Sequence, residues 1–371
     1  MSYLKKLLEG VDVEMKPLAD IAKITIGEFV HQNNQDKEAE FPVYNGGISP
    51  TGYYDKFNNT GDKIIVSARG ANAGFVNRIS KPYWAGNSCY SIGINDPARV
   101  NWLFIYYFIK ANENKLIGSQ QKGGIPAVSK KQMEVFLVPI PSPKDSKKSI
   151  EIQKEIVRIL DSFTELTAEL TAELTARKKQ YNYYREQLLS FKGEEVEWKP
   201  LEQVYKFQYG IGNTIPTSGG KYPVYGSNGI VGSHSEFNSE DSPVIGHIGA
   251  YAGIVNWGKG KHFVTYNGVI CKLINENVNP RYAYHLLLKQ DFNALAKNSS
   301  QPFVSYKELN AVQVPIPSLQ EQERIVSILD KFDSLTTSVD EGLPKEIELR
   351  KKQFEYYRDL LLTFPMNNLE F

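Results

Sequence analysis

Two stretches of the chain carry apolar residues at alternating steps of three and four positions. Within 150–191 the stepped positions are Leu160, Phe163, Thr167, Leu170, Leu174, Arg177, Tyr181, Tyr184 and Leu188. Within 319–363 they are Leu329, Phe332, Val339, Ile347, Arg350, Phe354, Tyr357 and Leu361. This spacing predicts two long helices with a heptad seam. Gly342 and Pro344 interrupt the second stretch, and we expect them to kink or break that helix.

The segments between the predicted helices follow another pattern. Residues 14–145 and 197–318 hold short apolar and β-branched runs between Gly-rich turns, which predicts mixed, mostly β domains. In each of them a proline precedes an apolar helical period. We therefore expect one helix to start near Pro97 and its counterpart to start near Pro280.

The chain repeats itself with a period of about half its length. "VEMKPLADIAKITIG" from Val13 returns as "VEWKPLEQVYKFQYG" from Val196, and "IVRILDSF" from Ile156 returns as "IVSILDKF" from Ile325. "FPVYNGGISPTGYYDKFN" is likewise echoed by "YPVYGSNGIVGSHSEFN", where apolar and Gly letters persist while polar letters change. The period is too long for a solenoid, so it indicates a duplicated domain followed by a duplicated helix.

Duplication of this kind predicts the layout of the whole chain. Internal pseudo-twofold symmetry reverses one copy relative to the other, so the two long helices should run antiparallel. We expect an α+β fold with two mostly β domains separated by an antiparallel coiled coil. The predicted parts are an N-terminal helix that closes the bundle (1–13), a first β domain (14–145), a first spacer (146–193), a second β domain (194–318) and a second spacer (319–371).

Several motifs resemble a known family, the specificity (S) subunit of type I restriction-modification systems. The resemblance rests on "VPIPSLQEQERIVSILDKF" (Val314–Phe332), its earlier partner "VPIPSP…IQKEIVRILDSF", and "RKKQ…YYR", which occurs twice. It covers essentially the whole chain. It implies two target-recognition domains, each reading one half of a bipartite site in double-stranded DNA. It also implies helices that set the gap and hold two methyltransferase (M) subunits, joined by restriction/translocase (R) subunits.

A tetrapeptide repeat, "TELTAELTAELTA" (Thr164–Ala176), lies inside the first predicted long helix. Each four-residue unit lengthens a helix by roughly 6 Å. That is at most about two base pairs of half-site spacing. A generic solvated helix turn would read the same way, but the resemblance favours a ruler.

Composition and charge add few constraints. The net charge is +1, with a basic front half and an acidic last segment, so any DNA footprint must be a local patch. We expect no disulfide between Cys89 and Cys271, because the repeat places them at matching positions of two separate domains. The five histidines show no metal-ligand spacing. With no long apolar run and no secretory leader, we expect a cytoplasmic protein without membrane segments.

Candidate DNA contacts fall in loops beside the repeated glycines, where arginine suits guanine, and asparagine or glutamine suits adenine. In the first domain these are Asn45, Arg69, Asn72, Ser119, Gln120, Gln121 and Lys122, with Lys122, Lys130 and Lys131 as phosphate anchors. In the second domain they are Ser227, Asn228, His234, His247, Tyr251, Ser300, Gln301 and Lys307. An ordinary polar loop side chain is the competing interpretation for each of them.

The helices carry more aromatic residues than one seam needs, namely Tyr181, Tyr183, Tyr184, Phe354, Tyr356 and Tyr357. We expect some of them to face the methyltransferase subunits, with Tyr181, Tyr184, Phe354 and Tyr357 as candidates. Packing at the ends of the helices is the alternative for this group.

Enzyme motifs do not appear in the sequence. "NPRY" (Asn279–Tyr282) lacks the second proline of a methyltransferase tetrad, and no phosphate loop or nucleophile elbow occurs. We expect no catalysis and no cofactor in this chain; the resemblance places S-adenosylmethionine in the partner methyltransferase. A stand-alone bipartite DNA-binding regulator or decoy remains an alternative. So does a coiled-coil scaffold whose β domains bind protein or glycan.

Overall fold

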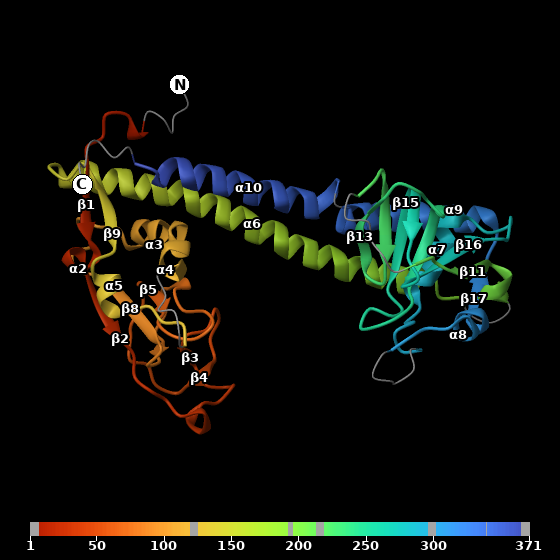
Figure 1. The fold of residues 1–371 in the computed structure, drawn as a ribbon, viewed down its shortest axis with the longest axis horizontal. Helices are drawn as coiled ribbons and strands as arrows, with labels where there is room; N and C mark the ends of the chain where they lie inside the picture. Colours follow the sequence, from red (N-terminus) through yellow and green to blue (C-terminus); the bar gives the residue numbers. More distant parts are fainter. Residues whose placement is uncertain are drawn as a thin grey trace. The chain divides into compact units, whose positions relative to one another are not determined.

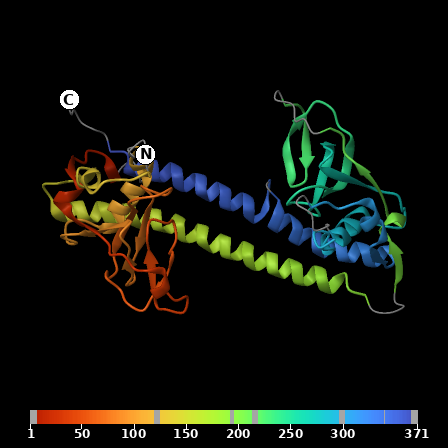
Figure 2. The same cartoon turned by 60° about the horizontal axis from the view of Figure 1, so that its bottom comes forward.

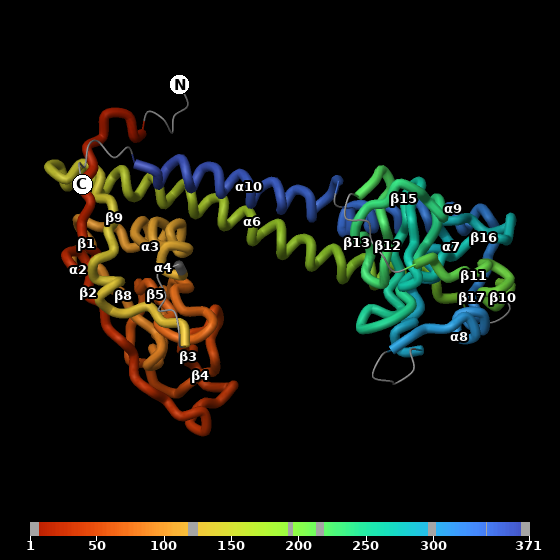
Figure 3. Tube along the Cα trace, in the orientation of Figure 1, coloured from red at the N-terminus to blue at the C-terminus, as the bar shows by residue number. Residues whose placement is uncertain are grey.

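The computed structural model describes residues 7–118, 125–191, 196–212, 219–295, 302–338 and 340–364 (Figure 1). The chain divides into two compact units. The first consists of Met1–Glu169 and Glu348–Phe371, and the second of Leu170–Ile347. Each unit holds one mostly β domain and a pair of antiparallel helical segments. The chain path through both can be followed in the tube trace (Figure 3).

In the first unit, strands form three small sheets. β1 (Val13–Pro17) pairs antiparallel with β9 (Leu137–Pro141). A four-stranded sheet has the order β2-β8-β5-β6, and a three-stranded sheet has the order β4-β3-β7. Their bounds are β2 Ala22–Ile26, β3 Phe41–Tyr44, β4 Gly52–Tyr54, β5 Lys63–Ser67, β6 Val76–Ile79, β7 Trp84–Ala85 and β8 Cys89–Ile94. Short helices α2 (Leu18–Ile21), η1 (Gln32–Asn34), α4 (Glu113–Gly118) and α5 (Lys130–Glu134) connect them.

In the second unit, the strands that correspond to the four-stranded and three-stranded sheets of the first unit join into one six-stranded sheet. β10 (Glu197–Pro200) pairs with β17 (Gln313–Ile316), and six strands follow the order β11-β16-β14-β15-β12-β13. Their bounds are β11 Tyr205–Tyr209, β12 Tyr222–Gly226, β13 Gly229–His234, β14 Ser239–Gly246, β15 Val255–Val264 and β16 Gly268–Leu273. The short helices are η3 (Leu201–Gln203) and α8 (Tyr306–Ala311).

One strand accounts for the difference between the sheets. β15 runs continuously for 10 residues and joins β14 on one side to β12 on the other. Its counterpart in the first unit is divided into β6 and β7 by residues 80–83. Pro82 lies in this interruption, and a proline has no N–H to give to a strand ladder. The same domain plan is therefore built once as a split sheet and once as a continuous one.

Each β domain carries one apolar helix, α3 (Trp102–Ala111) or α7 (Pro280–Lys289). Each helix has an asparagine N-cap whose Oδ1 accepts two backbone N–H bonds: Asn101 in α3 and Asn279 in α7. The predicted start near Pro280 is confirmed. The predicted start near Pro97 is wrong, because the capping asparagine, and not the proline, sets where α3 begins.

The long helices appear where the seam predicts them. α6 (Ser146–Leu188) is one helix of 43 residues, whereas α9 (Leu319–Thr337) and α10 (Gly342–Leu362) are separate, as predicted from the break at Gly342. In the first unit Phe163 of α6 stacks on Tyr357 of α10, with ring centroids 5.3 Å apart. In the second unit Tyr181 of α6 stacks on Phe332 of α9 at 6.2 Å. The expected α+β class with paired long helices is confirmed (Figure 2).

Each unit has its own apolar core, built where the β domain meets its helical pair. In the first unit Phe104 of α3 and Ile156 of α6 are fully buried in one cluster. Leu7 and Leu8 pack against this cluster, which also contains Leu361 and Phe364. Residues 7–8 and 361–364 therefore share one core, while residues 1–6 of the predicted N-terminal helix lie outside the described residues.

The two cysteines do not occupy matching positions, so this expectation is wrong. The register pairs Ser67 with Cys89 in the first unit, but Gly246 with Gly268 in the second. Cys271 therefore matches Ile92. Both thiols are buried and free, and burial raises the pKa of each. Among the described residues, no helix is long and apolar enough to cross a membrane.

Candidate DNA-recognition interface

Three loops and one connecting segment meet at one edge of the first domain. Ala68 donates its backbone N–H to Ser88 O at 2.8 Å, which ties the loop after β5 to the loop after β7. Gly70 donates to Pro126 O at 2.9 Å, and Val128 donates to Ala68 O at 2.9 Å. These bonds hold the segment that follows residues 119–124 against the same loops. We call residues 45–51, 68–75, 86–88 and 125–128 the first loop cluster.

The second domain repeats this arrangement bond by bond. His247 donates its backbone N–H to Asn267 O at 2.8 Å, Gly249 to Pro302 O at 2.8 Å, and Val304 to His247 O at 3.1 Å. Residues 226–228, 247–254, 265–267 and 302–304 form the second loop cluster. All of these ties are main-chain bonds, so the two clusters share a frame while their side chains are free to differ.

Glycines make the turn at the centre of each cluster possible. Gly70 and Gly74 have φ of 90° and 91°, and Gly249 and Gly253 have φ of 87° and 90°. A Cβ on Gly253 would lie 2.5 Å from Asn293 N, and one on Gly74 would lie 3.0 Å from Ile117 N. All four glycines therefore adopt left-handed turns, and other backbone approaches closely only at Gly74 and Gly253.

Some predicted contact residues are used to build the clusters. Asn45 Oδ1 accepts the backbone N–H of Ser88 at 3.1 Å. Ser227 Oγ lies 2.8 Å from Ile248 O and 2.9 Å from Asn267 O. Both side chains therefore connect the first loop of a cluster to its neighbours, which fixes their orientation within the frame.

Other predicted residues are exposed on the clusters. Arg69, Asn72, Asn228 and Tyr251 are exposed, and Tyr251 leaves 50% of its surface free. Main-chain registers place Ile248 where the first domain has Arg69, and Tyr251 where it has Asn72. The exposed set thus differs in charge and in hydrogen-bonding capacity between two matching frames.

The lysines lie on the short helices that follow each connecting segment. Lys130 and Lys131 belong to α5, and Lys307 belongs to α8; all three are exposed. Lys130 also reaches Glu134 Oε1 at 3.4 Å. Ser129 caps α5 through a capping box with Gln132, which positions the helix next to the first loop cluster.

The two predicted histidines have different settings. His234 lies half-buried on β13, accepts the N–H of Glu236 on Nδ1, and stacks on Phe263 at 4.2 Å. His247 is only 5% exposed, and its Nδ1 lies 2.9 Å from Val304 O. Burial lowers the pKa of His247 despite this hydrogen bond. Because the side chain of His247 is buried and hydrogen-bonded within the second loop cluster, it is not available to contact a base. We therefore leave His247 out of the proposed contacts.

Six further predicted contacts lie outside the described residues. They are Ser119, Gln120, Gln121, Lys122, Ser300 and Gln301.

Exposure of the helix aromatics differs from the prediction. Tyr181 is 5% exposed and its hydroxyl lies 3.2 Å from His285 Nδ1, so it belongs to the core. Phe354 and Tyr357 are half-buried, and Tyr184 is 38% exposed. The most exposed rings are Tyr183 at 61% and Tyr356 at 65%. These two occupy the same position of the repeated "RKKQ…YYR" motif, so the repeat itself pairs them in the sequence.

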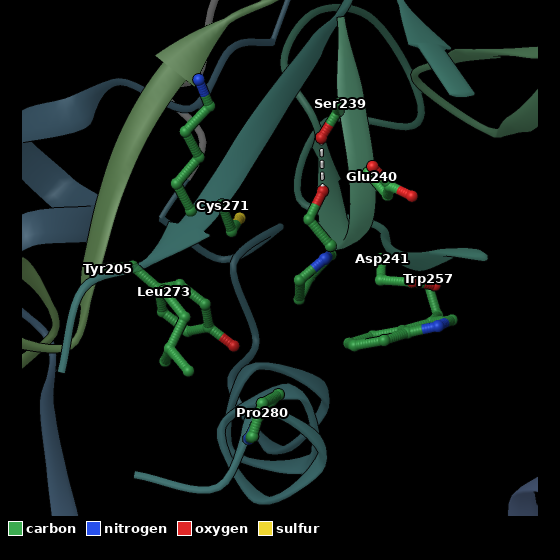
Figure 4. Close-up of a pocket in the computed structure, with 11 residues that line it drawn as sticks. Tyr205, Ser239, Glu240, Asp241, Trp257, Cys271, Leu273 and Pro280 are labelled. Carbon is green, nitrogen blue, oxygen red and sulfur yellow. Dashed lines mark hydrogen bonds between the residues drawn. The ribbon is translucent and has the colours of Figure 1, made fainter. Parts of the chain in front are cut away.

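A pocket of about 350 Å³ lies in the second unit between the sheet and the start of α7 (Figure 4). Ser239 and Ser242 hydrogen-bond each other at 2.5 Å, and Ser242 Oγ lies 3.5 Å from His262 Nε2. His262 is fully buried and its Nδ1 is engaged by Gly260 O, while the Cys271 thiol has a raised pKa. The two serines and His262 thus form one hydrogen-bonded chain, and the Cys271 thiol lies 3.8 Å from Val269 O. Within the part of the chain that the structure describes, no three metal-ligating side chains gather.

Comparison with known proteins agrees with this geometry. Residues 10–177 and 194–349 match the family described as Type I restriction modification DNA specificity domain. The chain is 34% identical to the Type I restriction enzyme EcoR124I/EcoR124II specificity subunit of Escherichia coli, covering 98% of each. It is also 34% identical to the EcoprrI specificity subunit of Escherichia coli, covering 92% of each.

A solved structure shares the fold. The type I restriction-modification S subunit from M. genitalium superposes with a TM-score of 0.71 at 22% identity, covering 98% of this chain and 99% of that one. The named relatives are restriction-enzyme subunits, which favours that function over a stand-alone regulator. The chain belongs to the family of type I restriction-modification DNA specificity subunits, and it is a DNA-recognition subunit without catalytic activity of its own.

Proposed function

We propose that each loop cluster reads one half of a bipartite DNA site, and that the exposed side chains on the two frames determine which bases are read. The observation that supports this most directly is the repetition of the same main-chain hydrogen bonds under different side chains, such as the exposed Arg69 against the half-buried Ile248. Arginine pairs with guanine through two hydrogen bonds, whereas an isoleucine offers only an apolar contact. The proposed contacts are Arg69, Asn72, Asn228, His234 and Tyr251, with Lys130, Lys131 and Lys307 on phosphates.

The long helices supply the distance between half-sites in this proposal. The whole of Thr164–Ala176 lies inside α6. Thr, Ala, Glu and Leu sustain a helix, so removing four residues shortens it by about 6 Å without breaking it.

The partners are methyltransferase subunits, which carry S-adenosylmethionine, and restriction/translocase subunits. Tyr183 and Tyr356 are the proposed docking residues, because exposed tyrosines at matching positions suit two copies of one partner. Replacing both with serine should abolish co-purification of the methyltransferase. The assembly acts on chromosomal DNA, in the cytoplasm.

Mapping of methylated sites tests the reading of DNA. Arg69→Ala should relax one base position of one half-site, at a cost of about 1–3 kcal/mol in discrimination. Lys131→Ala is the matched control: it removes a nearby positive charge and should weaken binding on every sequence alike. If Arg69→Ala also weakens all sequences uniformly, Arg69 is a phosphate contact.

The same mapping tests the ruler. Deletion of one TAEL unit should change the spacer length and leave both half-site sequences unchanged. An altered half-site in the deletion variant would exclude this role for α6.

A further inference from the structure

An ion pair joins the first β domain to its long helix. Arg78 of β6 places Nη1 3.0 Å from Asp161 Oδ1 of α6. Its guanidinium lies over the ring of Tyr106, 5.1 Å from the centroid. Tyr107 of α3 donates its hydroxyl to the same Asp161 oxygen at 2.5 Å. Strand, short helix and long helix therefore converge on one carboxylate.

The second domain builds the same junction from another position. Arg281 of α7 reaches Asp330 Oδ1 of α9 through Nη2 at 2.8 Å, and it also contacts Asp333. Its guanidinium lies over the ring of Tyr284 at 4.7 Å. His285 contacts Asp330 Oδ1 at 2.7 Å, in the place that Tyr107 takes in the first domain.

The arginine occupies different positions of the repeat in the two domains but makes the same kind of contact in both. Strand registers match Arg78 with Trp257, and helix caps match Leu103 with Arg281. Asp161 matches Asp330, and Tyr106 matches Tyr284. Both domains thus keep a guanidinium between the matching tyrosine and the matching aspartate, but one supplies it from a strand and the other from a helix. Retention of the contact after relocation of its source indicates that the contact itself matters.

Each unit has a second polar junction between its β domain and its long helix, formed by a buried glutamine. Gln153 of α6 is fully buried, accepts the N–H of Asn101 at 2.8 Å and donates to Arg99 O. Gln322 of α9 does the same with Asn279 at 2.7 Å and Asn277 O. Each domain is thus held to its long helix at two polar points in addition to a shared apolar core, and together these contacts restrain the angle between them. The glutamine is the same residue in both copies, so only the arginine junction differs between them.

We propose that Arg78 and Arg281 are positioning residues that fix the angle of each recognition domain on its long helix, and thereby the spacer length the protein accepts. This rests on the proposed function, since it assumes that each domain reads a half-site. The guanidinium acts through the aspartate and touches no base. Loss of the junction should leave the half-site sequences unchanged and broaden the accepted spacers.

The test is Arg78→Trp, which copies the residue of the second domain, alone and combined with Leu103→Arg. The full chain, assembled with its methyltransferase partners, is assayed on duplexes whose spacer is one base pair shorter, equal or longer. Arg78→Trp should reduce the preference for the native spacer about tenfold, as expected for a lost charged hydrogen bond. The double variant should recover it to within about threefold.

Arg324→Leu is the control. Arg324 lies on α9 and pairs with Glu321 of its own helix, so its loss should leave spacer preference unchanged. Should Arg78→Trp yield no folded chain, Arg78→Met takes its place, with the same expectation. A merely structural role would lower the yield of complex without changing spacer preference, and that result would overturn the proposal. So would a double variant no better than the single one. If the wild-type complex itself methylates no bipartite site, the proposed function fails instead.

Discussion

The two recognition domains have the same frame but different buried polar groups. Where the first domain has Ala68, Tyr83 and Tyr107, the second has His247, His262 and His285. All three histidines are buried, at 5%, 0% and 0% exposure. Backbone ties, helix caps and the glutamine junctions are the same in both. The comparison shows that this fold is specified by its main-chain bonds and junction residues, while even interior side chains can change chemistry.

The largest effect we predict comes from the turn glycines. Gly253→Ala should destabilise the chain most, because a left-handed backbone alone costs about 1–3 kcal/mol and the new Cβ would also lie 2.5 Å from Asn293 N. Gly249→Ala is its control, since nothing lies within 4 Å of its Cβ position. Gly74→Ala should fall between them. Urea denaturation of the full chain gives the ranking, and equal losses of stability in the three variants would contradict it.

The next largest effect concerns the buried glutamines, and here the domains should behave alike. Gln153→Met and Gln322→Met each leave a capping asparagine N–H and a backbone carbonyl unpaired, which costs about 1–3 kcal/mol. Hydrogen exchange should show α3 losing protection in the first variant and α7 in the second. If only one domain responds, the junctions are not equivalent.

The smallest predicted effect is a dependence of stability on pH that is present in the second domain and absent from the first. Burial lowers the pKa of His247 and of His262 below the unfolded value of about 6.5. Their neutral forms therefore contribute stability that is complete above pH of about 6.5 and is lost as the pH falls through the lower folded pKa. The loss is at most about 1.4 kcal/mol per pH unit for each histidine.

Hydrogen exchange at about pH 7 and at about pH 5.5, corrected for intrinsic rates, measures this difference, because the two values bracket the unfolded pKa of histidine. β14 and β15 should lose protection at the lower pH, whereas β5 and β6 should not. His247→Asn keeps a donor for Val304 O and does not titrate, so it should reduce the change. A loss of equal size in β5 would indicate a source common to both domains.

Much of the fold could be predicted from the sequence because its determinants are local or periodic. The heptad seam, the break at Gly342 and the paired turn glycines follow from spacing and residue type. The start of α3 was missed because a cap depends on which side chain reaches back to the helix, and Asn101 does so where Pro97 cannot.

The candidate site was less predictable for a different reason. Whether a polar loop residue faces outward or back onto the frame is not encoded in its type, and Asn45 turns back to Ser88 N. Junctions such as Arg78 to Asp161 link residues 83 positions apart, and the relocation to Arg281 hides the pairing from a simple alignment of the repeats. The matching Tyr183 and Tyr356 could have been chosen, but seam position alone does not indicate which ring is exposed.

Apart from the side chains of Asn45 and Ser227, each loop cluster is tied by peptide groups, which every residue except proline possesses in full. A substitution at Arg69 or Tyr251 therefore leaves the scaffold beneath it intact. Under the proposed function, single exchanges at these exposed positions would change the bases that are read while the main-chain bonds beneath them stay in place.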